Sequence, residues 1–307
     1  MNARRSLLPL VSLFVTAAAA WGSEWNVADH VPRERVVVQS HRGAGLLAEE
    51  NTIPAFEVGW SFGTIPEADV RTTQDGALVA FHDADFKRIL PQADPAFQAR
   101  SIETCRLDEL AALDVGAWKG PAFAGRRIPR LTEVFAAMQG RPERRLYLDI
   151  KRADLAQLAA EVRAHEVAAQ VILASRRPAL LREWKTLLPD SQTLLWMRGT
   201  ESSLEEQLAK LRADGFAGIT QLQVHIHPAE RPTDEEPFAV SRRFVRALGE
   251  ELRARGILFQ ALPFTADTSV YARLLDLGVE SFATDYPAVT AREIDAYYAA
   301  RRAASTR

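Results

Sequence analysis

The sequence predicts a single TIM barrel, a (β/α)8 fold in which eight parallel strands are surrounded by helices. Between about residues 35 and 302, short apolar or β-branched runs alternate with longer segments of helical periodicity. This alternation is typical of parallel strands joined by helical crossovers, and nearly eight such units are the content of one barrel. Nine strand-like segments can be counted, so we predict that Leu78–His82 is the surplus one and forms the returning arm of a hairpin.

The first strand and helix are predicted around a histidine. Residues 36–40 form a β-branched run, typical of a buried strand, that ends directly before His41. Residues 51–62 have apolar positions at helical spacing, and either Asn51 or Thr52 can act as the N-cap. We therefore expect His41 at the carboxyl end of a strand, which is where barrel enzymes carry their chemistry.

A tight hairpin is predicted after the second strand, residues 65–70. Asp75-Gly76 is a dipeptide that favours a two-residue turn between paired strands. Counting outward from such a turn pairs Asp69 with His82. The hairpin would place His82 beside the carboxylates of the second strand without any assumption about long-range contacts.

The rest of the chain continues the same alternation. Gly256 and Gly278 directly follow two helical segments and are typical helix C-caps. His225 and His227 end a predicted strand, and we expect one of them to face the barrel mouth. Further strands are predicted at 144–149, 170–174, 193–197, 218–226, 257–262 and 281–284, and further helices at 107–113, 131–138, 153–165, 178–188, 203–213, 240–255, 269–277 and 291–302.

Composition argues against nucleic acid and anionic membranes as binding partners. The formal net charge is −2 and no run of Arg or Lys is longer than a pair, so the sequence favours neither nucleic-acid nor anionic-membrane binding. The hydrophobic share of 47% is sufficient for a core. Cys105 is the only cysteine, so no intramolecular disulfide can form, and we expect its thiol to be a buried packing residue.

Residues 1–22 are predicted to be a signal peptide. Arg4 and Arg5 precede an apolar run over 7–20 that ends in Ala-Ala-Ala, a suitable cleavage site. The run is short for a membrane span, which needs about 20 residues, and no later stretch is long and apolar enough to cross a bilayer. We expect export, to a periplasm or to the outside, with an uncleaved N-terminal anchor as the alternative. The barrel domain is then expected over 35–302.

Paired carboxylates indicate a cation site. Glu67 and Asp69 are two residues apart, and residues i and i+2 of a strand point to the same face. Carboxylate oxygens suit a hard cation such as Mg²⁺ or Ca²⁺. His41 and His82 nearby suit general acid–base catalysis beside such a cation.

Five short motifs follow one another within this region. They are Ser-His-Arg-Gly at 40–43, Glu-Asn-Thr at 50–52, Glu-Ala-Asp-Val at 67–70, Asp-Gly at 75–76 and His-Asp at 82–83. In this order they resemble the glycerophosphodiester phosphodiesterase family, and further matches cover nearly all of the chain after about residue 35. The resemblance implies a TIM barrel independently of the periodicity.

The resemblance also implies roles for individual residues. His41 and His82 would form an acid–base pair, in which one deprotonates the attacking oxygen and the other protonates the leaving alkoxide. Glu67 and Asp69 would bind one divalent cation, Mg²⁺ or Ca²⁺, together with Asp149. Aspartate stands at 149 where the family carries glutamate, so the third ligand is shorter by one methylene.

Four further residues are predicted to act on the substrate or the site. Arg42 has the planar fork that binds phosphate, and Lys151, in the match to the family's Glu-x-Lys, would offset phosphate charge. Glu50 would either touch the metal or orient Arg42. Phe264 follows a strand near which the family often has Trp-Thr-x-Asn, and it would keep an apolar wall against the substrate alcohol.

The implied function is metal-dependent hydrolysis of a small glycerophosphodiester to sn-glycerol 3-phosphate and an alcohol such as choline or ethanolamine. One alternative is a related barrel phospholipase on intact lipids, similar to a sphingomyelinase D, which ranks second because the sequence has no extended apolar loop. The other is a non-catalytic phosphate-ester binding protein. Intact His41 and His82 argue against it, since binding alone does not need both.

Overall fold

The computed structural model describes residues 26–305 and contains the predicted closed barrel. Its eight parallel strands form a continuous ring, because β1 pairs with both β9 and β2. The fold class is therefore confirmed. The strands are β1 (Val37–Ser40), β2 (Ile65–Thr72), β4 (Leu146–Arg152), β5 (Val171–Ser175), β6 (Gln192–Met197), β7 (Gln221–His225), β8 (Leu258–Leu262) and β9 (Ser281–Thr284). The predicted signal peptide lies outside the described residues.

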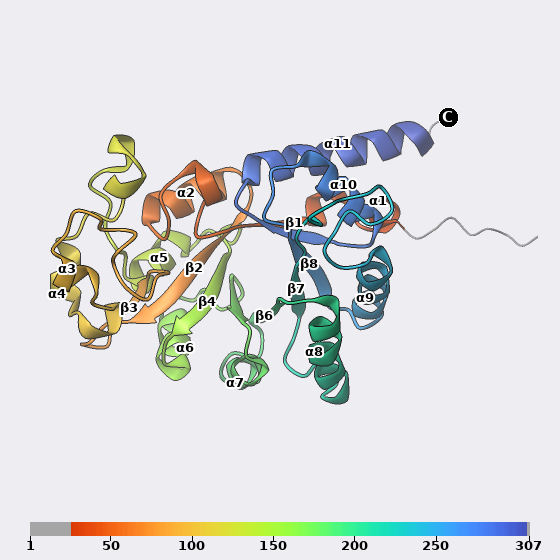
Figure 1. The fold of residues 1–307 in the computed structure, drawn as a ribbon. Helices are drawn as coiled ribbons and strands as arrows, with labels where there is room; N and C mark the ends of the chain where they lie inside the picture. The colour runs from red at the N-terminus through yellow and green to blue at the C-terminus, as the bar shows by residue number, and fades with distance from the viewer. Residues whose placement is uncertain (1–25, 306–307) are drawn as a thin grey trace, which may run out of the picture.

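The ninth strand, β3 (Leu78–Ala80), is the hairpin arm that the sequence predicts. It pairs antiparallel with β2 and with no other strand of the described chain. Figure 1 shows β3 at one side of the barrel, next to α3 (Pro95–Gln98) and α4 (Leu107–Ala111). The pairing extends β2 to Thr72, two residues beyond the predicted end.

The predicted hairpin register is wrong by one residue. The turn has three residues, 74–76, because the amide of Thr73 donates to the carbonyl of Ala77 at 2.9 Å and Gly76 adopts a positive φ of 85°. A left-handed residue at this position is typical of three-residue hairpin loops. The amide of Phe81, and not of His82, therefore donates to the carbonyl of Asp69, at 2.8 Å.

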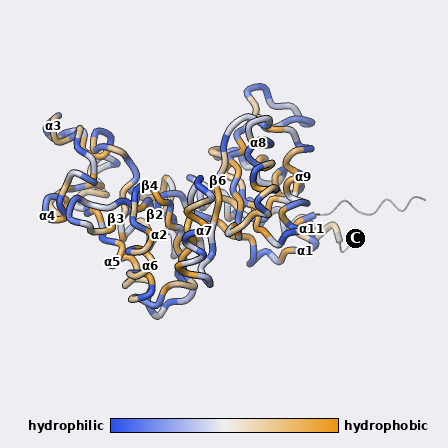
Figure 2. The backbone as a smooth tube through the Cα atoms, turned by 90° about the horizontal axis from the view of Figure 1, so that it is seen from below, coloured by the Kyte–Doolittle hydropathy of each residue, from blue (hydrophilic) through white to orange (hydrophobic). Residues whose placement is uncertain are grey.

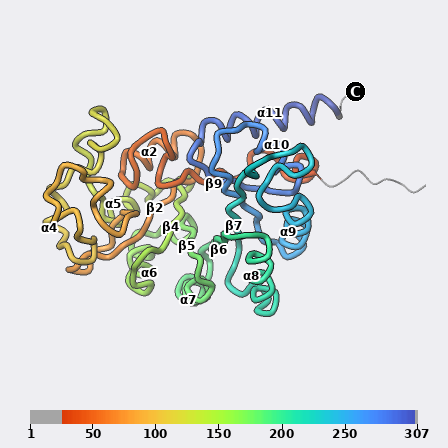
Figure 3. Tube along the Cα trace, viewed as in Figure 1, coloured from red at the N-terminus to blue at the C-terminus, as the bar shows by residue number. Residues whose placement is uncertain are grey.

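Helices cover the outside of the ring (Figures 1 and 3). Thr52 is the N-cap of the first long one, with its hydroxyl accepting from the amide of Ala55, which settles the choice between the two predicted caps. The long helices are α2 (Ile53–Ser61), α5 (Leu131–Met138), α6 (Leu155–Ala164), α7 (Pro178–Leu187), α8 (Glu201–Ala213), α9 (Arg242–Ala254), α10 (Thr268–Asp276) and α11 (Pro287–Ser305), and a short α1 (Val27–His30) precedes them. None of the helices in residues 26–305 is long and apolar enough to cross a membrane.

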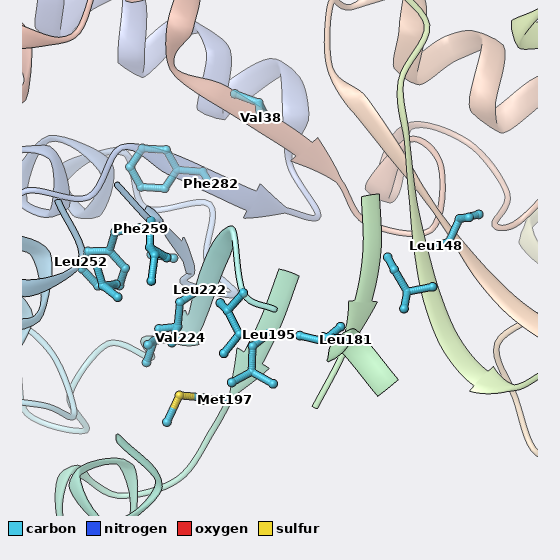
Figure 4. Close-up of a cluster of buried hydrophobic side chains, with 14 of the residues drawn as sticks. Val38, Leu148, Leu181, Leu195, Met197, Leu222, Val224, Leu252, Phe259 and Phe282 are labelled. Carbon is cyan, nitrogen blue, oxygen red and sulfur yellow. The ribbon is translucent and has the colours of Figure 1, made fainter. Parts of the chain in front are cut away.

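The main core lies between the strands and the helices. Figure 2 shows hydrophobic and hydrophilic stretches alternating along the chain, as expected for helices and strands that have one buried and one exposed side. In Figure 4, Leu195 and Met197 of β6 lie beside Leu222 and Val224 of β7, and all four are almost fully buried. Burial of such side chains is the main favourable term in folding.

A second, smaller core supports the segment between β3 and α5. Phe86, Ile102 and Leu110 are buried there together with Cys105, whose thiol is free. The prediction that Cys105 is a packing residue agrees with this position. The segment forms a shoulder beside the barrel mouth, and its residue Arg88 reaches the site described below.

Candidate active site

Three buried carboxylates meet on two adjacent strands of the barrel. Glu67 and Asp69 belong to β2 and Asp149 to β4, and Asp69 lies directly opposite Asp149 in the strand register. Oxygen atoms of all three lie within 4.8 Å of one another. The predicted set of metal ligands is therefore brought together by the pairing of β2 with β4.

The surroundings of this cluster fit a divalent cation. Oδ2 of Asp69 accepts from the side-chain amide of Asn51 at 2.7 Å, but its Oδ1 is buried without a hydrogen bond. Lys151 Nζ lies 2.9 Å from that Oδ1 without hydrogen-bond alignment, and it donates to Asp149. Burial raises the pKa of Asp69, but the charges of Lys151, His82 and Arg42 and the hydrogen bond from Asn51 together outweigh it and hold the pKa below its usual range. Ionised carboxylates with a spare oxygen are what Mg²⁺ or Ca²⁺ requires.

His41 faces this cluster from the end of β1. Its Nδ1 lies 2.6 Å from Oδ1 of Asp285, and its Nε2 is 4.0 Å from Oε2 of Glu67. A carboxylate can only accept, so Nδ1 carries the proton and Nε2 is turned toward the cluster. Burial lowers the pKa of His41, but the hydrogen bond to Asp285 and the charge of Glu67 together raise it above its usual value.

His82 reaches the same place from beyond β3. Its Nδ1 is 2.7 Å from Oδ1 of Asp83, and its Nε2 is 2.9 Å from Nη2 of Arg42. Arginine is always a donor, so Nε2 of His82 accepts and its proton sits on Nδ1. Each predicted catalytic histidine is thus oriented by a carboxylate at Nδ1.

Glu50 lies among arginines and outside the three-carboxylate cluster. Its carboxylate is 3.2 Å from Nη1 of Arg42 and pairs with both Nη atoms of Arg88 at 2.7 Å. Arg88 also binds Asp83, at 2.7 Å from Nε. Glu50, His82 and Asp83 could in principle hold a cation, but the Arg88 guanidinium already balances both carboxylates. Of the two predicted roles for Glu50, the structure favours orienting Arg42.

Several of these partners were not predicted from the sequence. Asp83 belongs to the His-Asp motif, and Asp285 to Thr-Asp-Tyr-Pro at 284–287, one of the further stretches that resemble the family. A search for residues that orient the histidines could have found both. Asn51 was considered only as a helix cap. No sequence pattern marks Arg88 as a site residue, since a single arginine in an irregular segment is common on protein surfaces.

The backbone is strained where the site is built. Five non-glycine residues of the described chain have a positive φ, and three of them belong to the site: Arg42 at 52°, Asn51 at 55° and Phe264 at 51°. Left-handed backbone is costly for residues with a side chain and persists where surrounding structure enforces it. Holding these three residues in this backbone conformation therefore costs some local stability, and it fixes the direction of their side chains.

Aromatic rings form one wall of the barrel mouth. Phe264 packs edge-on against His225 and stacks on His227, with ring centres 5.0 and 4.9 Å apart, and His225 stacks on Trp196 at 5.4 Å. The indole of Trp196 also donates to Asp149 at 3.2 Å. Burial lowers the pKa of His225 to about 4. His225 lines the inner of the two cavities described next, whereas His227 does not. Of these two histidines, His225 is therefore the one that faces the barrel mouth.

Two cavities meet at His41, Arg42 and Phe264. The inner one, of about 210 Å³, extends into the barrel and contains Glu67, His82, Asp149 and Lys151 in its lining. The outer one, of about 370 Å³, opens toward the turn after β1 and the shoulder segment. A larger cavity of about 720 Å³ lies at the opposite end of the barrel, where the strands begin, and none of the predicted site residues lines it.

Comparisons with known proteins agree with this geometry. Residues 41–289 match the Glycerophosphoryl diester phosphodiesterase family. The glycerophosphodiester phosphodiesterase of Caldanaerobacter subterraneus is 37% identical over 102 residues, which are 33% of this chain and only 40% of that protein. A glycerophosphodiester phosphodiesterase of Bacillus subtilis is 24% identical over 301 residues, covering 91% of this chain and 92% of that protein.

A solved structure supports the fold. A phosphodiesterase of Oleispira antarctica, determined in complex with the product sn-glycerol-3-phosphate, is similar with a TM-score of 0.62 and 24% sequence identity. The match covers 84% of this chain and 96% of that one.

Proposed function

Because the chain belongs to the Glycerophosphoryl diester phosphodiesterase family, we propose that it hydrolyses glycerophosphodiesters to sn-glycerol 3-phosphate and an alcohol. One observation carries the proposal: two carboxylate-oriented histidines, His41 and His82, line the same cavity as Glu67 and Asp149 of the three-carboxylate cluster. A phosphodiester at this position would have an acid–base group available for both the attacking and the leaving oxygen.

Glu67, Asp69 and Asp149 would hold one divalent cation, Mg²⁺ or Ca²⁺. When bound, such a cation offsets the negative charge of a phosphodiester and polarises its phosphoryl oxygen. Lys151 contacts the cluster directly, through Asp69 and Asp149, and would share these carboxylates with the cation.

Arg42 and Lys151 are suited to stabilise phosphate charge. Phosphoryl transfer is catalysed mainly by positioning and electrostatics, so preorganised cations contribute most where charge builds up. Arg42 is held by Glu50 and by its strained backbone, while its Nε is buried without a hydrogen bond. Buried donors usually have a hydrogen-bond partner, so this Nε–H group is suited to donate to an oxygen of a bound phosphate.

His41 and His82 would move the protons of the reaction. One removes a proton from the attacking oxygen and the other donates a proton to the departing alcohol. Asp285 and Asp83 fix the tautomers, so that Nε2 of each ring is the reacting nitrogen. Phe264 and Trp196 would provide the apolar wall against an ester substituent.

Glycerophosphocholine turnover, measured with and without chelator, tests this function. Turnover that chelator abolishes and divalent cation restores supports it. Binding without turnover would favour a phosphate-ester binding protein, and hydrolysis of diacyl phospholipid or sphingomyelin alone would favour the lipid-acting alternative.

Export of the protein is a further part of the proposal, supported by the apolar run over 7–20 and the small residues at its end. Expression with the native leader should give a mature chain that starts near residues 21–23. N-terminal sequencing that finds Met1 on soluble exported protein would contradict it.

A further inference from the structure

A cavity of about 720 Å³, which we call the lower cavity, lies at the end of the barrel opposite to the catalytic cluster. Its volume is in the range of small-molecule binding sites, about 300 to 1,000 Å³. None of the residues to which we assign a part in hydrolysis lines it, so that reaction does not account for it. Most of its polar lining residues lie within two positions of a strand start: Arg35, Arg145, Gln192, Thr220, Gln221 and Glu280.

Arginine side chains give the lower cavity a positive charge. Arg35, Arg145 and Arg253 reach it from the turn before β1, from the residue before β4 and from the last turn of α9. Glu34 and Glu280 are the carboxylates of its described lining, so the guanidinium groups outnumber them. A guanidinium group presents a planar fork of donors that matches the oxygens of a phosphate. The lining therefore favours an anionic ligand.

The guanidinium group of Arg35 is available to a ligand. Within residues 26–305 it forms neither a hydrogen bond nor an ion pair, and its charge acts at longer range on Glu280. Glu280 is half-buried, and burial raises its pKa more than the charges of Arg253 and Arg35 lower it. Because a carboxylate can accept several hydrogen bonds, Glu280 can bind hydroxyl groups of a ligand whose phosphate the arginines hold.

A chain of hydrogen bonds inside the barrel holds the floor of the lower cavity in place. Nη2 of Arg145 donates to Oε1 of Gln192 at 2.7 Å, and Nε2 of Gln221 donates to the same oxygen at 2.9 Å. The hydroxyl of Tyr147 donates to Oε1 of Gln221 at 2.7 Å and accepts from Gln260 at 3.3 Å. Gln221, Tyr147 and Gln260 are buried. Polar groups that are already held in place lose little conformational entropy when they bind a ligand.

We propose that the lower cavity is a second binding site, for a phosphate monoester whose alcohol part carries hydroxyl groups. Arg35 and Arg145 would bind the phosphate oxygens, and Glu280 and Gln221 would bind the hydroxyl groups. At neutral pH a phosphate monoester carries a charge of about −1.5 to −2, so arginines attract it more strongly than a diester with a single charge. This ligand class differs from the diester substrate of the catalytic cavity, and binding here depends on none of the catalytic residues.

The test is isothermal titration calorimetry of the variant Arg42→Ala in chelator, in which phosphate binding at the catalytic cavity is weakened. sn-Glycerol 3-phosphate should still bind, with one molecule per chain, inorganic phosphate should bind more weakly, and glycerol should not bind. Adding Arg35→Glu should raise the Kd for sn-glycerol 3-phosphate by about tenfold or more, because a charged donor is replaced by a like charge. Adding Arg182→Glu instead is the matched control and should leave this Kd unchanged. It makes the same change of charge at an exposed arginine of α7 that lines neither the lower cavity nor those at the barrel mouth.

Several results would overturn the lower site. If sn-glycerol 3-phosphate does not bind to Arg42→Ala, the catalytic cavity accounts for all phosphate binding. An unchanged Kd on adding Arg35→Glu, or an equal rise on adding Arg182→Glu, would show that the lower cavity does not hold the phosphate. Inorganic phosphate that binds as tightly as sn-glycerol 3-phosphate would overturn the role of the hydroxyl groups. If Arg35→Glu lowers the melting temperature, Arg35→Gln with Arg182→Gln as its control gives the same comparison. Turnover of glycerophosphocholine enters none of these measurements, so a failure of the proposed function is seen separately.

Discussion

Arg88 forms a bidentate ion pair with Glu50, with both nitrogen–oxygen distances at 2.7 Å. Because Arg88 also binds Asp83, the pair closes a ring of contacts that runs from Arg42 through Glu50, Arg88 and Asp83 to His82 and back to Arg42. The predicted phosphate-binding arginine and one predicted catalytic histidine are thus held together twice, once directly and once through Arg88.

Arg88→Met should lower kcat/KM for glycerophosphocholine by about tenfold or more, since small displacements of positioned groups are costly to catalysis. Arg88→Lys should recover little, because an ammonium cannot bind two carboxylates through a planar fork. Arg212→Met is the matched control: Arg212 bridges Glu205 and Glu251, and its side chain is 38% exposed against 40% for Arg88. An equal loss of activity in both variants would contradict a positioning role for Arg88.

His41→Ala and His82→Ala should each reduce turnover by about 10² to 10⁴-fold while keeping the fold, because a positioned acid or base contributes that much. With a nitrophenyl ester, whose leaving group needs no proton, the variant that lacks the general acid should regain most of its rate and the other should not. Near-normal rates in either folded variant with glycerophosphocholine would refute its assigned role.

Asp149→Ala should raise the cation concentration needed for activity and cost little thermal stability in chelator. The variant removes one of three carboxylates that repel one another, although it also deprives Lys151 and Trp196 of a partner. Asp149→Glu restores the residue typical of the family and should remain active with a changed preference between Mg²⁺ and Ca²⁺, since Mg²⁺ tolerates less distortion. Unchanged metal dependence in Asp149→Ala would place the third ligand elsewhere.

His225 should remain neutral down to about pH 4, because burial, and to a smaller extent the nearby His227, Arg198 and His41, lower its pKa to about 4. In the unfolded chain its pKa is near 6.5, so as the pH falls below 6.5 the unfolded state takes up the proton first and the free energy of unfolding decreases. His225→Phe, which keeps the ring stack, should weaken this decrease. An NMR titration midpoint of His225 near 6.5 in the folded protein would contradict the prediction.

The sequence by itself determined the fold class and most of the candidate site. Alternating strand and helix periodicities depend on neighbouring residues only, so they identify β-strands, helices and the barrel that they form. The i, i+2 spacing of Glu67 and Asp69 likewise puts both on one strand face. The order of the short motifs identified His41, His82 and Arg42, and the match to the family's Glu-x-Lys identified Lys151. The structure brings all four to one cavity.

The tertiary structure determines which distant residues the site residues contact. His41 and Asp285 are 244 positions apart, and their contact exists only because β1 pairs with β9 when the barrel closes. The contact of Glu50 with Arg42, which corresponds to one of its two predicted roles, is accompanied by an ion pair with Arg88, a residue of the irregular shoulder segment. Even the hairpin register, a local feature, needed the structure, because Asp75-Gly76 is compatible with two-residue and three-residue turns alike. Periodicity is set by adjacent residues, whereas contacts between distant segments are set by how the whole barrel packs, and that information is not written in any one stretch of the chain.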